Sequence, residues 1–193
     1  MGQLKTIAWD IDDVLNDLML LWFEEKWLND HPECGIQYEE IIDNPPHKIL
    51  GVSLQEYQKS LDDYRLSICY QQMVPVNEIK NWFIKQGNNY RHIVITSVPL
   101  ICAPASAQWV FKNFGVWIRS FHFVPSKRKN QHIPEYDKDK GSFLKWLGKA
   151  DFFIDDNTEN IKAAENAGVK SILIPRPWNG SQKTISESLM LIE

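Results

Sequence analysis

Short apolar segments alternate with amphipathic segments along most of this 193-residue chain. Five of the apolar segments have the length and composition of buried strands, and polar or turn-forming residues follow them. Several of the stretches between them have apolar residues at helical spacing and end at a glycine. This alternation predicts an α/β domain in which helices flank a Rossmann-like, parallel, five-stranded sheet. We expect strands over residues 4–9, 91–96, 118–124, 152–154 and 171–174, and helices over 76–86, 106–114, 141–147 and 158–167.

One interval is too long for a single crossover helix. About 80 residues separate the first two predicted strands, although a crossover needs only roughly a dozen or more. The interval contains two helical patterns, over residues 14–30 and 54–71, with a stretch rich in helix breakers between them. We therefore expect residues 1–16 and 74–193 to form the α/β core, and residues 17–73 to form a small helical cap.

Composition and charge exclude several classes of partner. The chain has 21 Lys and Arg against 25 Asp and Glu, a formal net charge of −4. This balance argues against binding to duplex nucleic acid or an anionic membrane surface, although a few lysines can still make a local phosphate site. No apolar run reaches the roughly 20 residues of a membrane-spanning helix. The three cysteines lack disulfide or zinc-site spacing, so we expect reduced thiols in a cytoplasmic protein. The sequence does not indicate an oligomeric state.

Polar residues gather where the predicted strands end. The carboxyl ends of parallel strands meet at one edge of a sheet, and ligands bind there. Three strand ends carry acids or hydroxyls, and a lysine-rich loop precedes the fourth strand. The residues that we expect at this edge are Asp10, Asp12, Thr96, Ser97, Lys138, Lys140, Asp155 and Asp156.

This combination of side chains suits phosphoryl transfer. Carboxylates from different strands offer the hard oxygen ligands that Mg²⁺ prefers. One carboxylate can attack phosphorus and form an aspartyl-phosphate, and a second can protonate the leaving oxygen and then deprotonate water. A hydroxyl and a lysine can stabilise the negative phosphoryl oxygens. The sequence therefore indicates a magnesium-dependent hydrolase of a small phosphorylated substrate.

Each motif alone has a simpler interpretation. Asp10 and Asp12 could form a solvated acidic turn, but a second apolar strand ending in two acids weakens that interpretation. Lys138 and Lys140 lie in a charged run, which by default is a solvated loop. We favour Lys140 as the phosphate-binding lysine, with Lys138 and Lys127 as alternatives.

Taken together, the motifs resemble those of the haloacid dehalogenase-like (HAD) superfamily. The matching segments are residues 7–15 (IAWDIDDVL), 93–96 (IVIT), Lys140 and 153–156 (FIDD), which span the chain in the family's order. The resemblance implies that Asp10 is the nucleophile and Asp12 the acid/base, and that Thr96 and Lys140 hold the transferring phosphoryl group, with Ser97 and Lys138 beside them. It also implies that Mg²⁺ is bound by Asp10, the backbone carbonyl of Asp12 and Asp156, with Asp155 as a further or alternative ligand.

Within this superfamily, the sequence is most similar to the 5'(3')-deoxyribonucleotidases. The similarity lies in residues 138–140, the pair of acids at 155–156 and the segment 175–179 (PRPWN), and it implies a nucleoside monophosphate substrate. Asp13 stands where the superfamily commonly has glycine. Two alternatives stay open: another HAD hydrolase activity such as dehalogenation, against which Asp12 argues, and a binding or regulatory protein without turnover.

Overall fold

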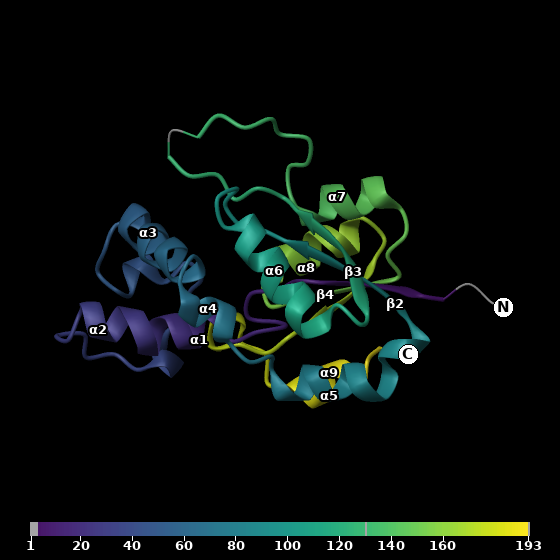
Figure 1. The fold of residues 1–193 in the computed structure, drawn as a ribbon, viewed down its shortest axis with the longest axis horizontal. Coiled ribbons are helices and arrows are strands. Elements are labelled where there is room, and N and C mark those ends of the chain that lie inside the picture. Colours follow the sequence, from purple (N-terminus) through teal and green to yellow (C-terminus); the bar gives the residue numbers. More distant parts are fainter. Residues whose placement is uncertain (1–3, 130, 193) are drawn as a thin grey trace.

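A parallel sheet of five strands forms the centre of the computed structural model, which describes residues 4–129 and 131–192 (Figure 1). The strand order is β3-β2-β1-β4-β5. The predicted parallel five-stranded sheet is confirmed, and each strand overlaps its predicted range. Residues 1–3, 130 and 193 of the predicted core lie outside the described residues. The strands are β1 (Thr6–Trp9), β2 (Arg91–Thr96), β3 (Ile118–Phe123), β4 (Phe152–Asp155) and β5 (Lys170–Leu173).

The strand order places the predicted site residues side by side. β1 is the central strand, and it pairs with β2 on one side and with β4 on the other. Trp9, the last residue of β1, lies in register with Val94 of β2 and Ile154 of β4. The residues that follow these positions therefore share one edge of the sheet.

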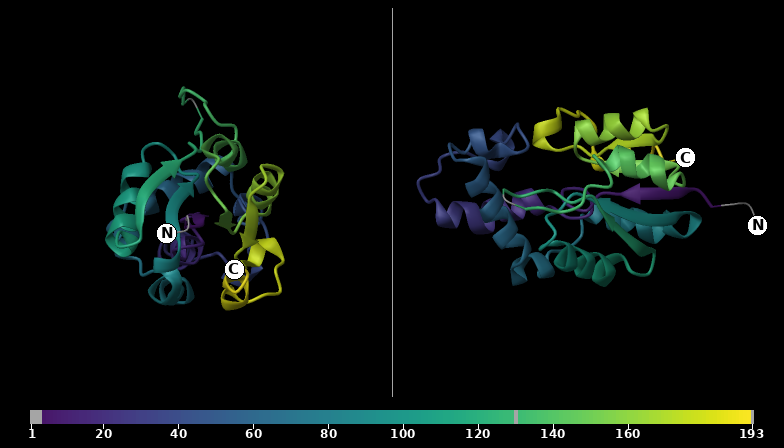
Figure 2. Two further views of the ribbon diagram at one scale, coloured as in Figure 1. Left: turned by 90° about the vertical axis from the view of Figure 1, so that its right-hand side faces the viewer. Right: turned by 90° about the horizontal axis from the view of Figure 1, so that it is seen from above.

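Helices cover both faces of the sheet (Figure 2). Alternate residues of β1 point to opposite faces, so Ile7 and Trp9 belong to one apolar cluster and Ala8 to another. The first cluster includes residues of α5 (Asn77–Gln86), α6 (Ala103–Phe114) and α9 (Ile185–Leu189). The second includes residues of α7 (Lys140–Leu147) and α8 (Thr158–Asn166). Among the described residues, no helix is long and apolar enough to cross a membrane.

The predicted cap contains four α-helices, which lie beyond the carboxyl end of β1 (Figure 1). The predicted helix over residues 54–71 is in fact two helices, because the chain turns at Leu66 and the Ser67 hydroxyl caps the second one. The helices are α1 (Leu18–Trp22), α2 (Leu28–Asp30), α3 (Leu54–Arg65) and α4 (Ile68–Gln72), and a π-helical turn, Phe23–Trp27, joins the first two.

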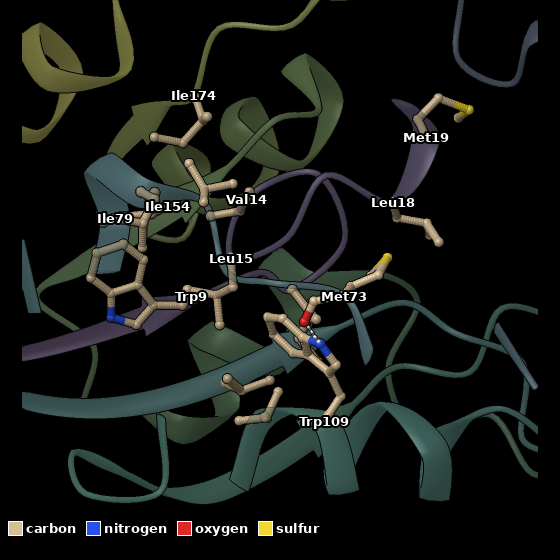
Figure 3. Packing of buried hydrophobic residues seen from close by; sticks show 14 of the residues in the cluster. Trp9, Val14, Leu15, Leu18, Met19, Met73, Ile79, Trp109, Ile154 and Ile174 are labelled. Carbon is tan, nitrogen blue, oxygen red and sulfur yellow. Dashed lines mark hydrogen bonds between the residues drawn. The ribbon is translucent and has the colours of Figure 1, made fainter. Parts of the chain in front are cut away.

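One continuous apolar cluster joins the cap to the sheet. Trp9 of β1 and Trp22 of α1 are both fully buried members of it. Figure 3 draws Trp9, Leu15 and Leu18 in this cluster. It also shows Trp109 of α6 donating a hydrogen bond of 3.0 Å to the Met73 carbonyl. The apolar core therefore holds the cap against the edge of the sheet where the acids lie.

Candidate active site

Lys140 joins two of the predicted acids. It is the first residue of α7, and only 1% of its side chain is exposed. Its ammonium lies 2.7 Å from Asp10 Oδ2 and 2.7 Å from Asp155 Oδ2. The Asp139 carboxylate caps α7 by accepting a hydrogen bond from the backbone N–H of Ser142. The helix start thus holds Lys140 between the ends of β1 and β4.

Burial controls the charges of this pair. It raises the pKa of Asp10 to about 7, although the ammonium of Lys140 opposes the shift. For Lys140, burial favours the neutral amine, but the carboxylates of Asp10 and Asp155 raise its pKa, so the lysine stays charged. Asp10 Oδ1 is buried and has no hydrogen-bond partner among the described residues. A buried oxygen without a partner costs desolvation free energy, and a bound cation would remove that cost.

Three buried carboxylates lie close enough to share one cation. Asp10, Asp155 and Asp156 each offer an oxygen, and these oxygens lie within 4.8 Å of one another. Lys140 pairs with two of the three, Asp10 and Asp155, so the cluster has excess negative charge. Burial and the neighbouring Asp155 raise the pKa of Asp156 well above its usual range. Both oxygens of Asp155 already accept hydrogen bonds, from Lys140, Asn160 and the backbone of Asn157. Asp10 and Asp156 are therefore the more available metal ligands.

Asp12 is held by two residues of the cap. Nε and a terminal nitrogen of Arg65, at the end of α3, each lie 3.0 Å from Asp12 Oδ2. The Tyr70 hydroxyl of α4 lies 3.2 Å from Asp12 Oδ1, and the Asn16 amide donates to the same oxygen at 3.3 Å. The position of the predicted acid/base therefore depends on α3 and α4.

The Arg65 guanidinium is paired with a second acid as well. It donates at 3.1 Å to Asp62, one turn earlier in α3. Asp62 also receives two hydrogen bonds from Arg128, at 2.6 and 2.7 Å, and Arg128 belongs to the loop after β3. Charges of alternating sign thus run from Asp12 through Arg65 and Asp62 to Arg128, and they connect the cap to that loop.

Asp13 adopts a backbone conformation that favours glycine. Its φ of 62° lies in the left-handed region, which glycine enters freely and aspartate tolerates better than most residues. Its carboxylate accepts a hydrogen bond of 2.9 Å from the Met19 backbone N–H, and its carbonyl accepts one of 2.7 Å from Arg176. Burial raises the pKa of Asp13 to about 7, against the effect of Arg176.

The segment after β5 holds both acidic turns in place. Trp178 donates its indole N–H to Asp156 Oδ2 at 2.8 Å. The Asn179 amide donates to the backbone carbonyls of Asp156 and Ile174, at 2.8 and 2.7 Å. With Arg176 bound to the carbonyl of Asp13, the C-terminal segment fixes the turns that follow β1 and β4.

These groups line a cavity of about 260 Å³. Its core wall contains Asp10, Asp12, Asp13, Thr96, Ser97, Ser126, Lys140, Asp156, Asn157 and Asn160. Its cap wall contains Leu18, Met19, Asn44, Pro45, Tyr57, Leu61 and Arg65.

The structure separates the three candidate lysines. Lys140 is inside the cavity, whereas Lys138 is exposed and does not line it. Lys138 and Lys127 instead line a second cavity of about 580 Å³ beside the loop after β3. Lys127 there forms an ion pair of 2.6 Å with Glu135. Among the three, only Lys140 contacts the acids of the site.

Sequence reasoning did not find Arg65, Tyr70 or Trp178. Arg65 did carry a signal: it follows Tyr57 and Leu61 at intervals that place it on the apolar face of α3, where a charge needs a partner. Trp178 lies in the segment that resembles the nucleotidases, but nothing in that pattern assigns its N–H to Asp156.

Similar solved structures are those of HAD-superfamily hydrolases. No protein-family model matches the sequence, and no curated protein matches it. A protein from Thermotoga maritima, assigned as a beta-phosphoglucomutase, superposes with a TM-score of 0.59 at 14% identity, over 97% of this chain and 98% of that chain. A haloacid dehalogenase-like hydrolase from Streptococcus pneumoniae gives a TM-score of 0.53 at 13% identity, over 97% of this chain and 92% of that chain.

A third structure agrees with these two. A HAD-superfamily hydrolase of subfamily IA from Geobacter sulfurreducens gives a TM-score of 0.53 at 12% identity, over 98% of this chain and 97% of that chain. At these identities the similarity concerns the fold. The chain therefore has the Rossmann-like α/β fold of the HAD hydrolases.

Proposed function

We propose that this protein is a magnesium-dependent phosphomonoesterase that forms an aspartyl-phosphate on Asp10. The observation that carries the proposal is the buried Lys140 ammonium, which bridges Asp10 and Asp155 in a cavity that Asp12 and Asp156 also line. A nucleophilic carboxylate, an acid/base, a cation for phosphoryl oxygens and carboxylates for a metal are thus within one small site.

The donor set fits Mg²⁺. Asp10 and Asp156 each keep one carboxylate oxygen that receives no hydrogen bond from the described residues, and the cluster has excess negative charge. Few carboxylate ligands, with water and phosphate oxygens completing the shell, are typical of Mg²⁺ sites. When bound, the cation supplies positive charge to the phosphoryl oxygens. Asp155 positions Lys140, and the carbonyl of Asp12 is the remaining proposed ligand.

In the first step, a carboxylate oxygen of Asp10 forms a bond to phosphorus while the bond from phosphorus to the ester oxygen breaks. Asp12 gives its proton to the departing oxygen, which leaves as an alcohol. Lys140 and Thr96 bind the phosphoryl oxygens, whose negative charge persists throughout the transfer.

In the second step, Asp12 removes a proton from a water molecule that attacks the phosphorus of the aspartyl-phosphate. The bond between phosphorus and the Asp10 oxygen breaks, and inorganic phosphate leaves. Arg65 and Tyr70 keep the Asp12 carboxylate directed into the cavity in both steps.

A nucleoside monophosphate is the substrate that the sequence resemblance implies within this class. The segment 175–179 supports it only indirectly, because in this structure its side chains hold Asp156 and the turn at Asp13. Nucleoside 5'-monophosphates therefore belong in the substrate panel beside smaller phosphate esters.

The test is phosphate release from a panel of phosphate esters, with Mg²⁺ and with chelator. We expect release by the wild-type protein with Mg²⁺, none by Asp10→Asn, and wild-type rates for Asp30→Asn, an exposed acid of the cap. Equal rates for wild type and Asp10→Asn would refute the proposal. Binding of phosphate with no release from any ester would instead support the non-hydrolytic alternative.

A further inference from the structure

The leaving group of a phosphate ester has a defined place in this cavity. In the proposed function, on which this inference rests, phosphorus lies at Asp10 and the ester oxygen lies at Asp12. The rest of the leaving group must then extend toward the cap wall. That wall consists of Leu18, Met19 and other side chains from α1, α3 and the segment between them.

The cap wall has no free positive charge among its described residues. Its one cation, Arg65, is 8% exposed in its side chain and is already paired with Asp12 and Asp62. Asp62 in turn is paired with Arg128, so the positive and negative charges along this connection balance. An anionic group on the substrate would have to break the contact between Arg65 and Asp12, and it would lie close to the carboxylates of Asp12 and Asp13.

The unpaired polar groups of the cap wall are neutral. The Tyr57 hydroxyl has no hydrogen-bond partner among the described residues, although only 4% of the residue is exposed and its ring packs edge-on against Trp22. Burial raises the pKa of Tyr57, so the phenol keeps its proton. The half-buried Asn44 amide is the second such group. Leu18, Met19 and Leu61 complete this wall with apolar surface.

We infer that the substrate is a phosphate ester of an uncharged alcohol, whose hydroxyl or apolar groups contact Tyr57, Asn44 and the apolar side chains of the cap wall. Esters that carry a second anionic group near the phosphate are disfavoured.

A matched pair of substrates tests the charge. Glycerol 3-phosphate and 3-phosphoglycerate differ in whether a hydroxymethyl or a carboxylate group ends the leaving group. We expect kcat/KM with Mg²⁺ to be about tenfold or more higher for glycerol 3-phosphate, because the carboxylate would be buried without a partner. An equal or reversed preference would overturn the inference.

Two variants locate the selectivity in the cap wall. Asn44→Lys adds a cation at a half-buried position of this wall, and it should shift the preference toward 3-phosphoglycerate. Gln55→Lys adds the same charge at an exposed position of α3 outside the cavity, and it should leave the preference unchanged. A shift of the same size in both variants would contradict the assignment to the cap wall.

Binding separates this inference from the proposed function. The same phosphates are titrated calorimetrically into Asp10→Asn with Mg²⁺, where no turnover is needed. If no ester is hydrolysed by the wild type but glycerol 3-phosphate binds more tightly than 3-phosphoglycerate, the proposed function fails and the inference about the cap wall stands. If 3-phosphoglycerate binds at least as tightly, the inference fails whatever the activity.

Discussion

Replacing Arg65 by methionine tests whether the cap holds the acid/base. The methionine keeps most of the apolar stem and removes only the charged end. Breaking a buried ion pair from one side costs about 3–5 kcal/mol, because the other charge stays buried without its partner. Asp62 keeps Arg128, so the uncompensated charge is that of Asp12, and we expect the low end of this range, about 3 kcal/mol.

The assay is urea unfolding at pH 7 in a double-mutant cycle with Asp12→Asn. Removing the Asp12 charge removes the reason for the penalty, so the two changes together should destabilise less than the sum of the single changes. Lys59→Met, which breaks an exposed pair with Asp63 on the same helix, is the control and should leave the unfolding midpoint unchanged. Additivity of Arg65→Met and Asp12→Asn within about 0.5 kcal/mol would refute the reasoning.

Three further predictions concern residues outside the cap. Trp178→Phe removes the N–H that donates a hydrogen bond to Asp156, and it should weaken Mg²⁺ binding about 10–100-fold in a direct titration. Trp146→Phe, at an exposed tryptophan, is the control and should leave the Mg²⁺ affinity unchanged. Equal affinities in the two variants would contradict a role of Trp178 in positioning Asp156. Burial lowers the pKa of His92, whose ring accepts a hydrogen bond from the indole of a β1 tryptophan, so the folded protein binds fewer protons than the unfolded chain below about pH 6.5. The free energy of unfolding should therefore fall as the pH drops through this range, and the fall should be smaller in His92→Gln. Parallel profiles of unfolding free energy against pH for wild type and variant would contradict this role of His92. Gly141→Ala would place a methyl group 2.5 Å from a carbonyl oxygen of α8. We therefore expect a loss of about 1–3 kcal/mol in unfolding free energy. A variant as stable as the wild type would contradict the close packing of α7 on α8.

The sheet and the edge that carries the acids could be predicted because both depend on local patterns. Apolar strands and glycine-terminated helices are visible in short windows, and a parallel sheet brings its strand ends together by geometry alone. Asp10 and Asp156 follow their strands directly, and Thr96 and Asp155 are the last residues of theirs, so the prediction that they share one edge holds in the structure.

The contacts that hold the site could not be predicted in the same way. Arg65 lies 53 residues from Asp12 along the chain, and the Trp178 indole lies 22 residues from the Asp156 carboxylate that it contacts. Such pairings depend on how the cap and the C-terminal segment pack, which no local pattern encodes. The break between α3 and α4 was missed for a related reason: Leu66 and Ser67 are acceptable inside a helix, and the turn between them brings Tyr70 to Asp12.

The two neighbouring lysines illustrate what a three-dimensional constraint adds to the sequence pattern. Lys138 and Lys140 are two residues apart in a charged run and look alike in sequence. Asp139 caps α7, and this cap places Lys140 on the buried side of the helix while Lys138 stays exposed in the preceding loop. A single helix start therefore decides which ammonium reaches Asp10.

The most direct test of the central claim is mass spectrometry of the covalent intermediate. The Asp12→Asn variant is incubated with Mg²⁺ and an aryl phosphate, whose leaving group needs no acid, and is then quenched and digested. Because Asp12 is absent when water must be activated, we predict that the peptide containing Asp10 gains the mass of one phosphoryl group. In the double variant, Asp10→Asn with Asp12→Asn, the same peptide should gain no phosphoryl group. The account is contradicted if the wild type releases phosphate but the Asp10 peptide of Asp12→Asn stays unmodified. It is also contradicted if the variant carries the phosphoryl group on another residue.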